Sequence, residues 1–129
     1  MFFSNSSISA YKQTANLAAL TKSPQELLDM VFEEIEISTR TAANLYMQGE
    51  NEAARLAVAR SIELIQDGLI AYVDPQYAVS KDILAAYSSW VSLLVKANIN
   101  SDIVPLTVVL GLVGEMRSTF AELDVPAAA

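Results

Sequence analysis

The sequence predicts an all-α protein whose fold is an antiparallel up-down four-helix bundle with a mobile N-terminal arm. Glycine and proline are scarce, with four of each among 129 residues, so long stretches lack the residues that interrupt helices. Within these stretches apolar residues recur every three or four positions, which is the period of a helix with one buried face. The turns between them are short, so successive helices are expected to lie antiparallel.

The first predicted helix begins at Ser23 and ends before Gly49. Ser23 can cap the helix, Pro24 suits its first position, and Glu26 can complete a capping box. Six residues at heptad-like spacing are expected to face the core: Leu27, Val31, Ile35, Ser38, Ala42 and Leu45. Three other large apolar residues fall off this stripe: Met30, Phe32 and Ile37.

The second predicted helix begins near Asn51 and ends at Asp74-Pro75. Its core positions are expected to be Ala54, Val58, Ile62, Ile65, Leu69 and Tyr72. Gly68 falls inside this span, where glycine costs about 1 kcal/mol relative to alanine. Close packing against a neighbouring helix explains that glycine better than contact with a partner does.

The third helix is expected to begin at Ser80 as its cap, and a polar turn over residues 98–101 ends it. Its core stripe is predicted to be Ile83, Tyr87, Trp90 or Val91, Leu94 and Ala97. Asp102 can cap the fourth helix, and Pro105 then lies in the first turn, where proline is tolerated. The fourth core stripe is predicted to be Leu106, Val109, Val113, Met116 and Phe120.

Residues outside the four helices are predicted to be loosely held. Residues 1–22 are rich in Ser, Asn, Thr and Ala and form the arm, which still carries Ile8 and Tyr11. Residues 23–123 form the bundle, and residues 124–129 form a disordered tail.

Composition excludes several kinds of function. The chain has no cysteine and no histidine, so thiolate chemistry, most metal sites and the usual general base are absent. A net charge of −7 disfavours nucleic acid and anionic membranes as partners. The N-terminus lacks the features of a signal peptide, and the longest apolar run, Val108 to Val113, is too short to span a bilayer. We therefore expect a cytoplasmic protein that is not an enzyme, needs no cofactor or metal, and does not insert into a membrane.

Two helices carry more apolar residues than one buried stripe requires. The fourth has Val104, Val108 and Leu112 beside its core stripe, and the third adds Leu93 and Val95. These residues either widen the core stripe or line an apolar groove for a partner's helices. If a groove exists, the arm could cover it before the partner binds. The acidic residues of the first helix are interpreted as a solvated face, since nothing near them supplies a nucleophile or a phosphate site.

Several segments together resemble the flagellin export chaperones of the FliS family, from Ile8 to about Phe120. The matching segments are Ile8 to Tyr11, Ser23 to Phe32, Ala59 to Asp74, Ala97-Asn98 with Asp102, and Glu115 with Phe120. Three features differ from the family's usual pattern. Glu33-Glu34 stands where Asp-Gly is usual, a Gly-Gly-Glu loop before the third helix is absent, and residues Tyr87 to Leu93 replace a Tyr-x-Tyr-Met stretch followed by two arginines. The chain therefore resembles a divergent member of the family.

The resemblance implies a function without a catalytic step. Family members bind the disordered C-terminal segment of flagellin in the cytoplasm, prevent its premature polymerisation and deliver it to the membrane protein of the flagellar type III export gate. The client folds into helices on the bundle. The resemblance also implies that the arm takes part in partner contacts, which we carry over to Ile8 and Tyr11 alone.

From the surplus apolar positions we predict further partner contacts at Met30, Leu84, Tyr87, Val91, Val108 and Leu112. The alternative is a self-associating structural bundle that hides the same residues in a homodimer and has no flagellin client. A weak homodimer of the free chaperone is also left open.

Overall fold

The computed structural model describes residues 23–128, with side chains placed for residues 23–122. The described chain consists of helices and turns, in the order α2 (Pro24–Met47), α3 (Asn51–Gly68), the 3-10 helix η1 (Ile70–Tyr72), α4 (Ser80–Asn100) and α5 (Val104–Ala128). This confirms the predicted all-α fold. The predicted arm lies outside the described residues, and the predictions for Ile8 and Tyr11 lie outside them too.

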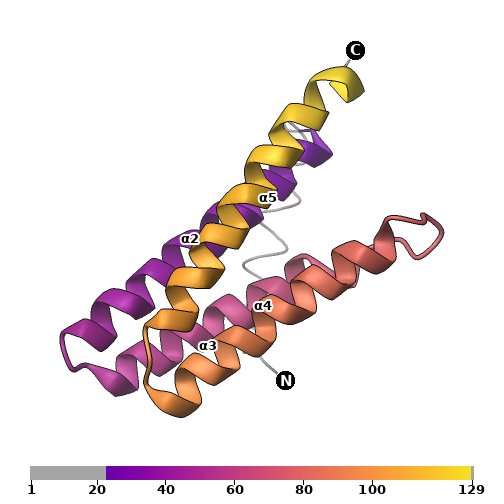
Figure 1. The fold of residues 1–129 in the computed structure, drawn as a ribbon. Coiled ribbons are helices and arrows are strands. Elements are labelled where there is room, and N and C mark those ends of the chain that lie inside the picture. Colours follow the sequence, from indigo (N-terminus) through magenta and orange to yellow (C-terminus); the bar gives the residue numbers. More distant parts are fainter. Residues whose placement is uncertain (1–22, 129) are drawn as a thin grey trace.

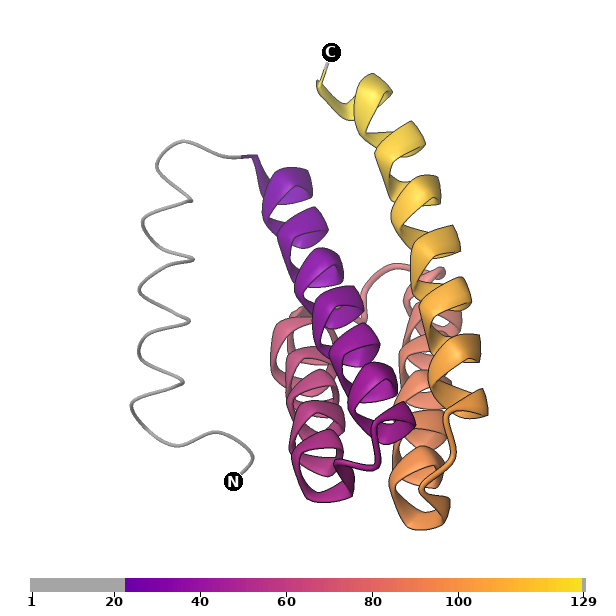
Figure 2. The ribbon, with the colours of Figure 1, turned by 90° about the vertical axis from the view of Figure 1, so that its left-hand side faces the viewer.

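The four long helices form two layers (Figures 1 and 2). One layer contains α2 and α5, the other contains α3 and α4, and each helix runs antiparallel to the next along the chain. Packing follows a closed order: α2 packs on α3 and α5, and α4 packs on the same two helices. The layers diverge toward the end where α2 begins, and there α2 and α5 extend beyond the other pair (Figure 1).

The helix ends follow local sequence signals. The Glu26 N–H donates to Ser23 Oγ at 3.1 Å and the Ser23 N–H donates to Glu26 Oε1 at 3.2 Å, which confirms the capping box. Gly49 follows α2 with a φ of 78°, a left-handed conformation that glycine adopts without a steric penalty. At the start of α5, Asp102 lies two residues before the helix and accepts a hydrogen bond from the Val104 N–H.

The buried face of α2 differs from the predicted heptad stripe. Phe32, predicted to lie off the stripe, is fully buried, whereas Leu27 and Val31 are only partly buried. At the other end Tyr46 is buried in place of Leu45. The buried residues Phe32, Ile35, Thr39, Ala42 and Tyr46 are spaced by three and four positions, so the core face keeps a heptad-like repeat. It uses positions 32, 39 and 46 where the prediction had 31, 38 and 45, because both registers lie within one helix face and packing against α3 and α5 selects between them.

The connection between α3 and α4 also differs from the prediction. α3 ends at Gly68, and η1 follows it, so the helix does not continue to Asp74. Gly68 is therefore the last residue of α3 and not an interior one. Tyr72, predicted to be a core residue, is 73% exposed. Ser80 begins α4, but its hydroxyl donates to the Asp74 carbonyl and does not cap the helix.

An aromatic cluster lies at the centre of the core. Trp90 is buried, with its ring centroid 6.4 Å from that of Phe32 and 5.1 Å from that of Tyr87. The choice between Trp90 and Val91 is thus decided for Trp90, because Val91 is only partly buried. The predicted residues Leu106, Val109 and Val113 are fully buried in α5. This helix runs to Ala128, past the predicted boundary at residue 123.

Two polar networks join the helices inside the bundle. Ser61 of α3 hydrogen-bonds Ser38 of α2, and its Oγ lies 2.9 Å from Thr39 Oγ1. Near the α4–α5 turn, the Tyr46 hydroxyl donates to Asn98 Oδ1 at 2.8 Å, and Asn98 Nδ2 donates to the Arg55 carbonyl at 3.2 Å. Asn98 lies in the last turn of α4, where the sequence predicted a polar turn. Its hydrogen bonds connect α4 to α2 and α3.

Residues Val104–Glu122 of α5 are long and apolar enough, by length and composition, to cross a membrane. Leu106, Val109 and Val113 in this segment are buried within the bundle. Core helices of soluble proteins pass the same test, so we treat α5 as a bundle helix.

Candidate partner-binding surface

The outer faces of α4 and α5 lack charge over long distances. No charged residue occurs between Ile83 and Val95, or between Ile103 and Gly114. The exposed polar residues of these segments are small hydroxyls such as Ser88, Ser92 and Thr107. An outer face without charge can bury its surface against another protein without desolvating an ion.

One apolar row lies on the side of α4 that faces α3. Leu84, Val91, Val95 and Ile99 are spaced by seven, four and four residues, so they share a face of the helix. We call these four residues the α4 stripe. Asn98 lies next to this stripe on the helix surface and donates a hydrogen bond to the Arg55 carbonyl of α3. The stripe therefore lies on the side of α4 that faces α3. Exposure increases toward the turn, since Leu84 and Val91 are half-buried, whereas Ile99 is 76% exposed.

A second apolar row lies on the outer face of α5, on the side turned away from α2. Val104, Val108 and Leu112, spaced by four residues, form this α5 stripe. Arg117 reaches α2. Each residue advances about 100° around the helix axis, so Val108, nine residues before Arg117, points to the opposite side of the helix. Val104 is 62% exposed and Val108 is 44% exposed. The two stripes therefore lie on either side of α4.

The residues predicted to contact a partner do not form one compact patch. Leu84 and Val91 belong to the α4 stripe, and Val108 and Leu112 belong to the α5 stripe. Met30 lies on α2, apart from both stripes. Tyr87 is 3% exposed and packs on Trp90, so its ring belongs to the core and offers almost no surface to a partner. A partner that touched the four stripe residues would have to follow the outside of the bundle across α4.

The sequence interpretation missed Ile99, the most exposed large apolar residue of the described chain. It was assigned to a polar turn over residues 98–101, whereas α4 continues to Asn100. The available signal was its spacing, because Ile99 continues the four-residue repeat of Val91 and Val95.

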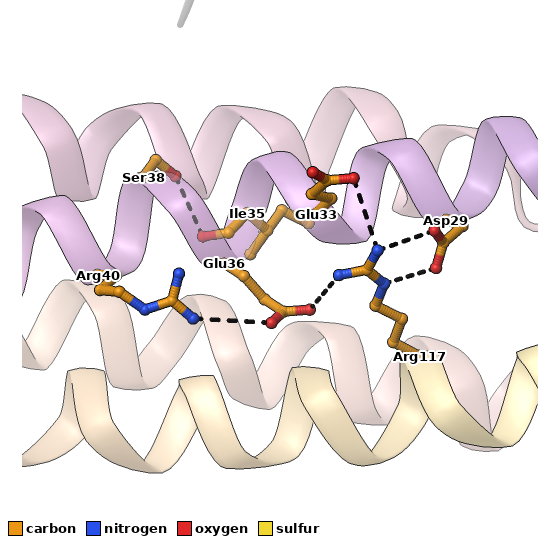
Figure 3. Close-up of polar contacts among 7 residues, drawn as sticks. All are labelled: Asp29, Glu33, Ile35, Glu36, Ser38, Arg40 and Arg117. Atoms are coloured by element: carbon orange, nitrogen blue, oxygen red, sulfur yellow. Dashed lines mark hydrogen bonds and ion pairs between the residues drawn. The ribbon is translucent and has the colours of Figure 1, made fainter.

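The α2–α5 side of the molecule is different in character, because ion pairs connect these two helices (Figure 3). Arg117 of α5 donates two hydrogen bonds to Asp29, of 2.6 and 2.9 Å, and a third of 3.2 Å to Glu36. Its guanidinium also lies 3.5 Å from Glu33. The hydrogen bonds from Arg117 lower the pKa of Asp29, and the hydrogen bonds to Asp29 and Glu36 raise the pKa of Arg117. These groups are partly exposed, so the pairing stabilises the fold by about 1 kcal/mol or less.

A hollow with a volume of about 400 Å³ lies beside this ion-pair cluster. Its lining residues come from the first three turns of α2 and from α5 near Phe120, and they include Met30. Within the described residues no group of three or more acidic side chains is arranged to hold a metal ion. The chemistry available at these surfaces is therefore association with apolar and charged groups of a partner.

Comparison with known proteins identifies relatives of the chain. Residues 7–127 match the family model for "Flagellar protein FliS". The chain is 26% identical over 108 residues to the flagellar secretion chaperone FliS of Escherichia coli K12, which covers 81% of this chain and 79% of that protein. It is 24% identical over 125 residues to the flagellar secretion chaperone FliS of Salmonella typhimurium LT2, covering 95% of this chain and 93% of that protein.

Proposed function

This chain belongs to the flagellar protein FliS family, and we propose that it is a cytoplasmic export chaperone that binds the C-terminal segment of flagellin. Its relatives are named flagellar secretion chaperones. The proposed action is masking: the bundle covers a client segment that would otherwise polymerise, and delivers it to the type III export gate. No covalent step is involved, so the protein acts without enzyme activity.

The observation that carries this proposal is the uncharged apolar surface on both sides of α4. Monomeric proteins rarely leave contiguous apolar patches bare, and such patches usually mark interaction sites. The α4 and α5 stripes are both built from residues spaced by about one or two helical turns. Helical segments of a client can pack their own apolar faces along such rows.

The separation of the two stripes supports an extended client over a compact one. A client segment that followed the surface across α4 would contact both stripes and bury a large area. Ordering a disordered segment on binding costs about 2–5 kcal/mol of the gross interaction energy. A long and mostly apolar contact surface is the kind that can offset this cost.

Isothermal titration calorimetry of the full chain with the C-terminal segment of flagellin from the same organism tests the proposal. We expect a one-to-one complex with a strongly negative heat-capacity change, because apolar burial and coupled folding both lower the heat capacity. A flagellin segment truncated before its C-terminal residues serves as the matched control and should not bind.

The same preparation distinguishes the self-association alternative. Sedimentation analysis of the free chain should show mainly monomer that gains mass with the client. A folded, stable homodimer that fails to bind the flagellin segment at high micromolar concentration would contradict the chaperone proposal. The α4 and α5 stripes would then be assigned to the dimer interface.

A further inference from the structure

The hollow beside the ion-pair cluster is separate from the surface proposed for the client. Its lining residues belong to α2 and α5, at the end where these two helices extend beyond α3 and α4 (Figure 1). The α5 stripe lies in the first half of the same helix and on its opposite side. A partner in the hollow could therefore be bound at the same time as a client on the stripes.

The apolar part of the hollow is preformed. Leu28, Met30, Phe32 and Phe120 contribute its apolar lining. The rings of Phe32 and Phe120 are stacked, with a centroid distance of 5.7 Å and an interplanar angle of 20°. Phe32 is fully buried and also packs on Trp90, so it offers almost no surface of its own and instead holds the partly buried Phe120 ring in place as the aromatic wall. An apolar side chain that enters the hollow thus meets a wall that needs no rearrangement.

The rim of the hollow carries excess negative charge. Among the described residues that line it, Glu26, Asp29 and Glu33 are acidic and Arg117 alone is basic. Arg117 is shared among Asp29, Glu33 and Glu36, so its single charge cannot neutralise them all. Figure 3 shows the ion pairs of Arg117 with Asp29 and Glu33, and both of these acidic residues line the hollow. The combination is an apolar hollow with a negative rim.

We propose that this hollow docks a basic amphipathic helix of a second partner protein. Apolar side chains from one face of that helix enter the hollow, and flanking Lys or Arg side chains approach Asp29 and Glu33. The sign of the rim selects this occupant, because an acidic helix would place like charges together. This inference goes beyond the client proposal and uses residues on the other side of the molecule.

Two synthetic peptides test the charge rule directly. Each is a helical peptide of about 16 residues, or four to five turns, with the same leucine face. One peptide has lysines beside that face and the other has glutamates. Each is titrated into the full chain while the methyl signal of Met30 is followed by NMR. We expect the lysine peptide to shift the Met30 signal and to leave Met47, at the other end of α2, unchanged.

Matched variants assign the interaction to the rim. Glu33→Gln should weaken binding of the lysine peptide by about two- to fivefold, as expected for loss of an exposed ion pair. Glu34→Gln, the same change one residue away and outside the lining, should leave the affinity unchanged. Binding should also weaken as NaCl rises from about 50 to about 500 mM, because salt screens exposed charges. Equal binding of both peptides, or equal affinity of the two variants, would overturn the proposal.

The chain's own N-terminal residues are the rival occupant. Residues 1–22 contain Lys12 and Lys22 and no acidic residue. The double variant Lys12→Gln with Lys22→Gln tests this rival without added peptide. If the double substitution shifts the Met30 signal, and the lysine peptide does not bind the wild-type chain, then the chain's own N-terminal residues fill the hollow and the proposal is wrong. Neither outcome affects the flagellin calorimetry, so failure here and failure of the chaperone proposal can be distinguished.

Discussion

The α2–α3 pair and the α4–α5 pair bury similar core faces but present different outer faces. Glu33, Glu34 and Arg40 are exposed on α2, and α3 exposes Glu52, Arg55, Arg60 and Asp67. Between residues 83 and 95 of α4 and in the first half of α5, the exposed side chains are apolar or small hydroxyls, and the charged residues of α4 lie nearer its ends, at Lys81, Asp82 and Lys96. The core of both pairs is continuous around Phe32 and Trp90. The two halves therefore share one source of stability and differ in what they offer to a partner.

The difference shows how a bundle can carry a binding surface without a cleft. Charged outer faces keep a helix pair solvated and contribute little to stability. An uncharged apolar face adds nothing to the core and increases the tendency to associate. Its presence on α4 and α5 is best explained by a partner that covers it. Substitutions in the shared core should therefore change stability, and substitutions on this surface should change partner binding.

Trp90→Ala should have the largest effect because Trp90 contacts aromatic residues of both halves. Removing a fully buried Trp side chain should lower the free energy of unfolding by about 3–5 kcal/mol. Urea unfolding followed by far-UV circular dichroism measures this loss, and Ser92→Ala on the exposed face of α4 is the control. A loss below about 1 kcal/mol would contradict the central position of Trp90.

Alkaline pH should weaken the core through Tyr87. Burial raises the pKa of Tyr87 to about 12, from its usual value of 10.0. Because the folded pKa is the higher one, its contribution to stability is complete below pH 10 and is lost as pH rises toward 12. The loss should reach about 2 kcal/mol. Absorbance titration at alkaline pH should show one late-ionising tyrosine that is absent in Tyr87→Phe, whereas ionisation of all tyrosines near pH 10 would refute the prediction.

Val108→Ser combined with Leu112→Ser should impair client binding and leave the core intact. Both residues lie on the α5 stripe, where they add to the exposed apolar surface. We expect a loss of about tenfold or more in affinity for the flagellin segment, with a change in unfolding free energy of about 0.5 kcal/mol or less. Calorimetry and urea unfolding measure the two quantities.

The matched control for that variant is Leu56→Ser on the outer face of α3. Leu56 is 70% exposed, more than either Val108 or Leu112, but it lies in the charged half of the molecule. Its substitution should leave client affinity unchanged. An equal loss of affinity in both variants would show that the difference between the two halves does not determine binding.

Gly111→Ala should give the smallest effect and the opposite sign. A Cβ built at Gly111 has no atom of the described residues within 4 Å, so alanine fits without strain. Alanine should stabilise α5 by about 0.5–1 kcal/mol through its higher helix propensity. Thermal unfolding checks this, and an unchanged or lower stability would refute it. Weaker client binding in the same variant would show that the client packs closely on the bare backbone of this position.

Much of the fold could be predicted because its signals are local. The capping box at Ser23 and the breaks near Gly49 and residue 101 depend on residues a few positions apart. The buried face of α5 was also predicted, since Leu106, Val109 and Val113 follow the helical period. Errors arose where the signal was not local. The end of α3 at Gly68 and the exposure of Tyr72 depend on how the connection to α4 packs.

The candidate surface was predicted only in outline. Leu84, Val91, Val108 and Leu112 were identified as surplus apolar residues, but periodicity could not separate Tyr87, which is buried, from them. Periodicity also could not show that the stripes lie on two sides of α4, because their placement depends on which neighbouring helix packs against each face of α4 and α5. The contacts of Arg117 with Asp29 and Glu36 join residues more than 80 positions apart and had no sequence signal.

By itself, the sequence determined the helical class, the helix starts, the absence of thiol and imidazole chemistry, and the resemblance to the FliS family. These follow from residue types and from interactions within one or two helical turns. The tertiary structure alone decided which apolar residues are core and which are surface, and where the hollow with its negative rim lies. Each helix has neighbours on two sides, and the side chains that meet there come from segments far apart in the chain.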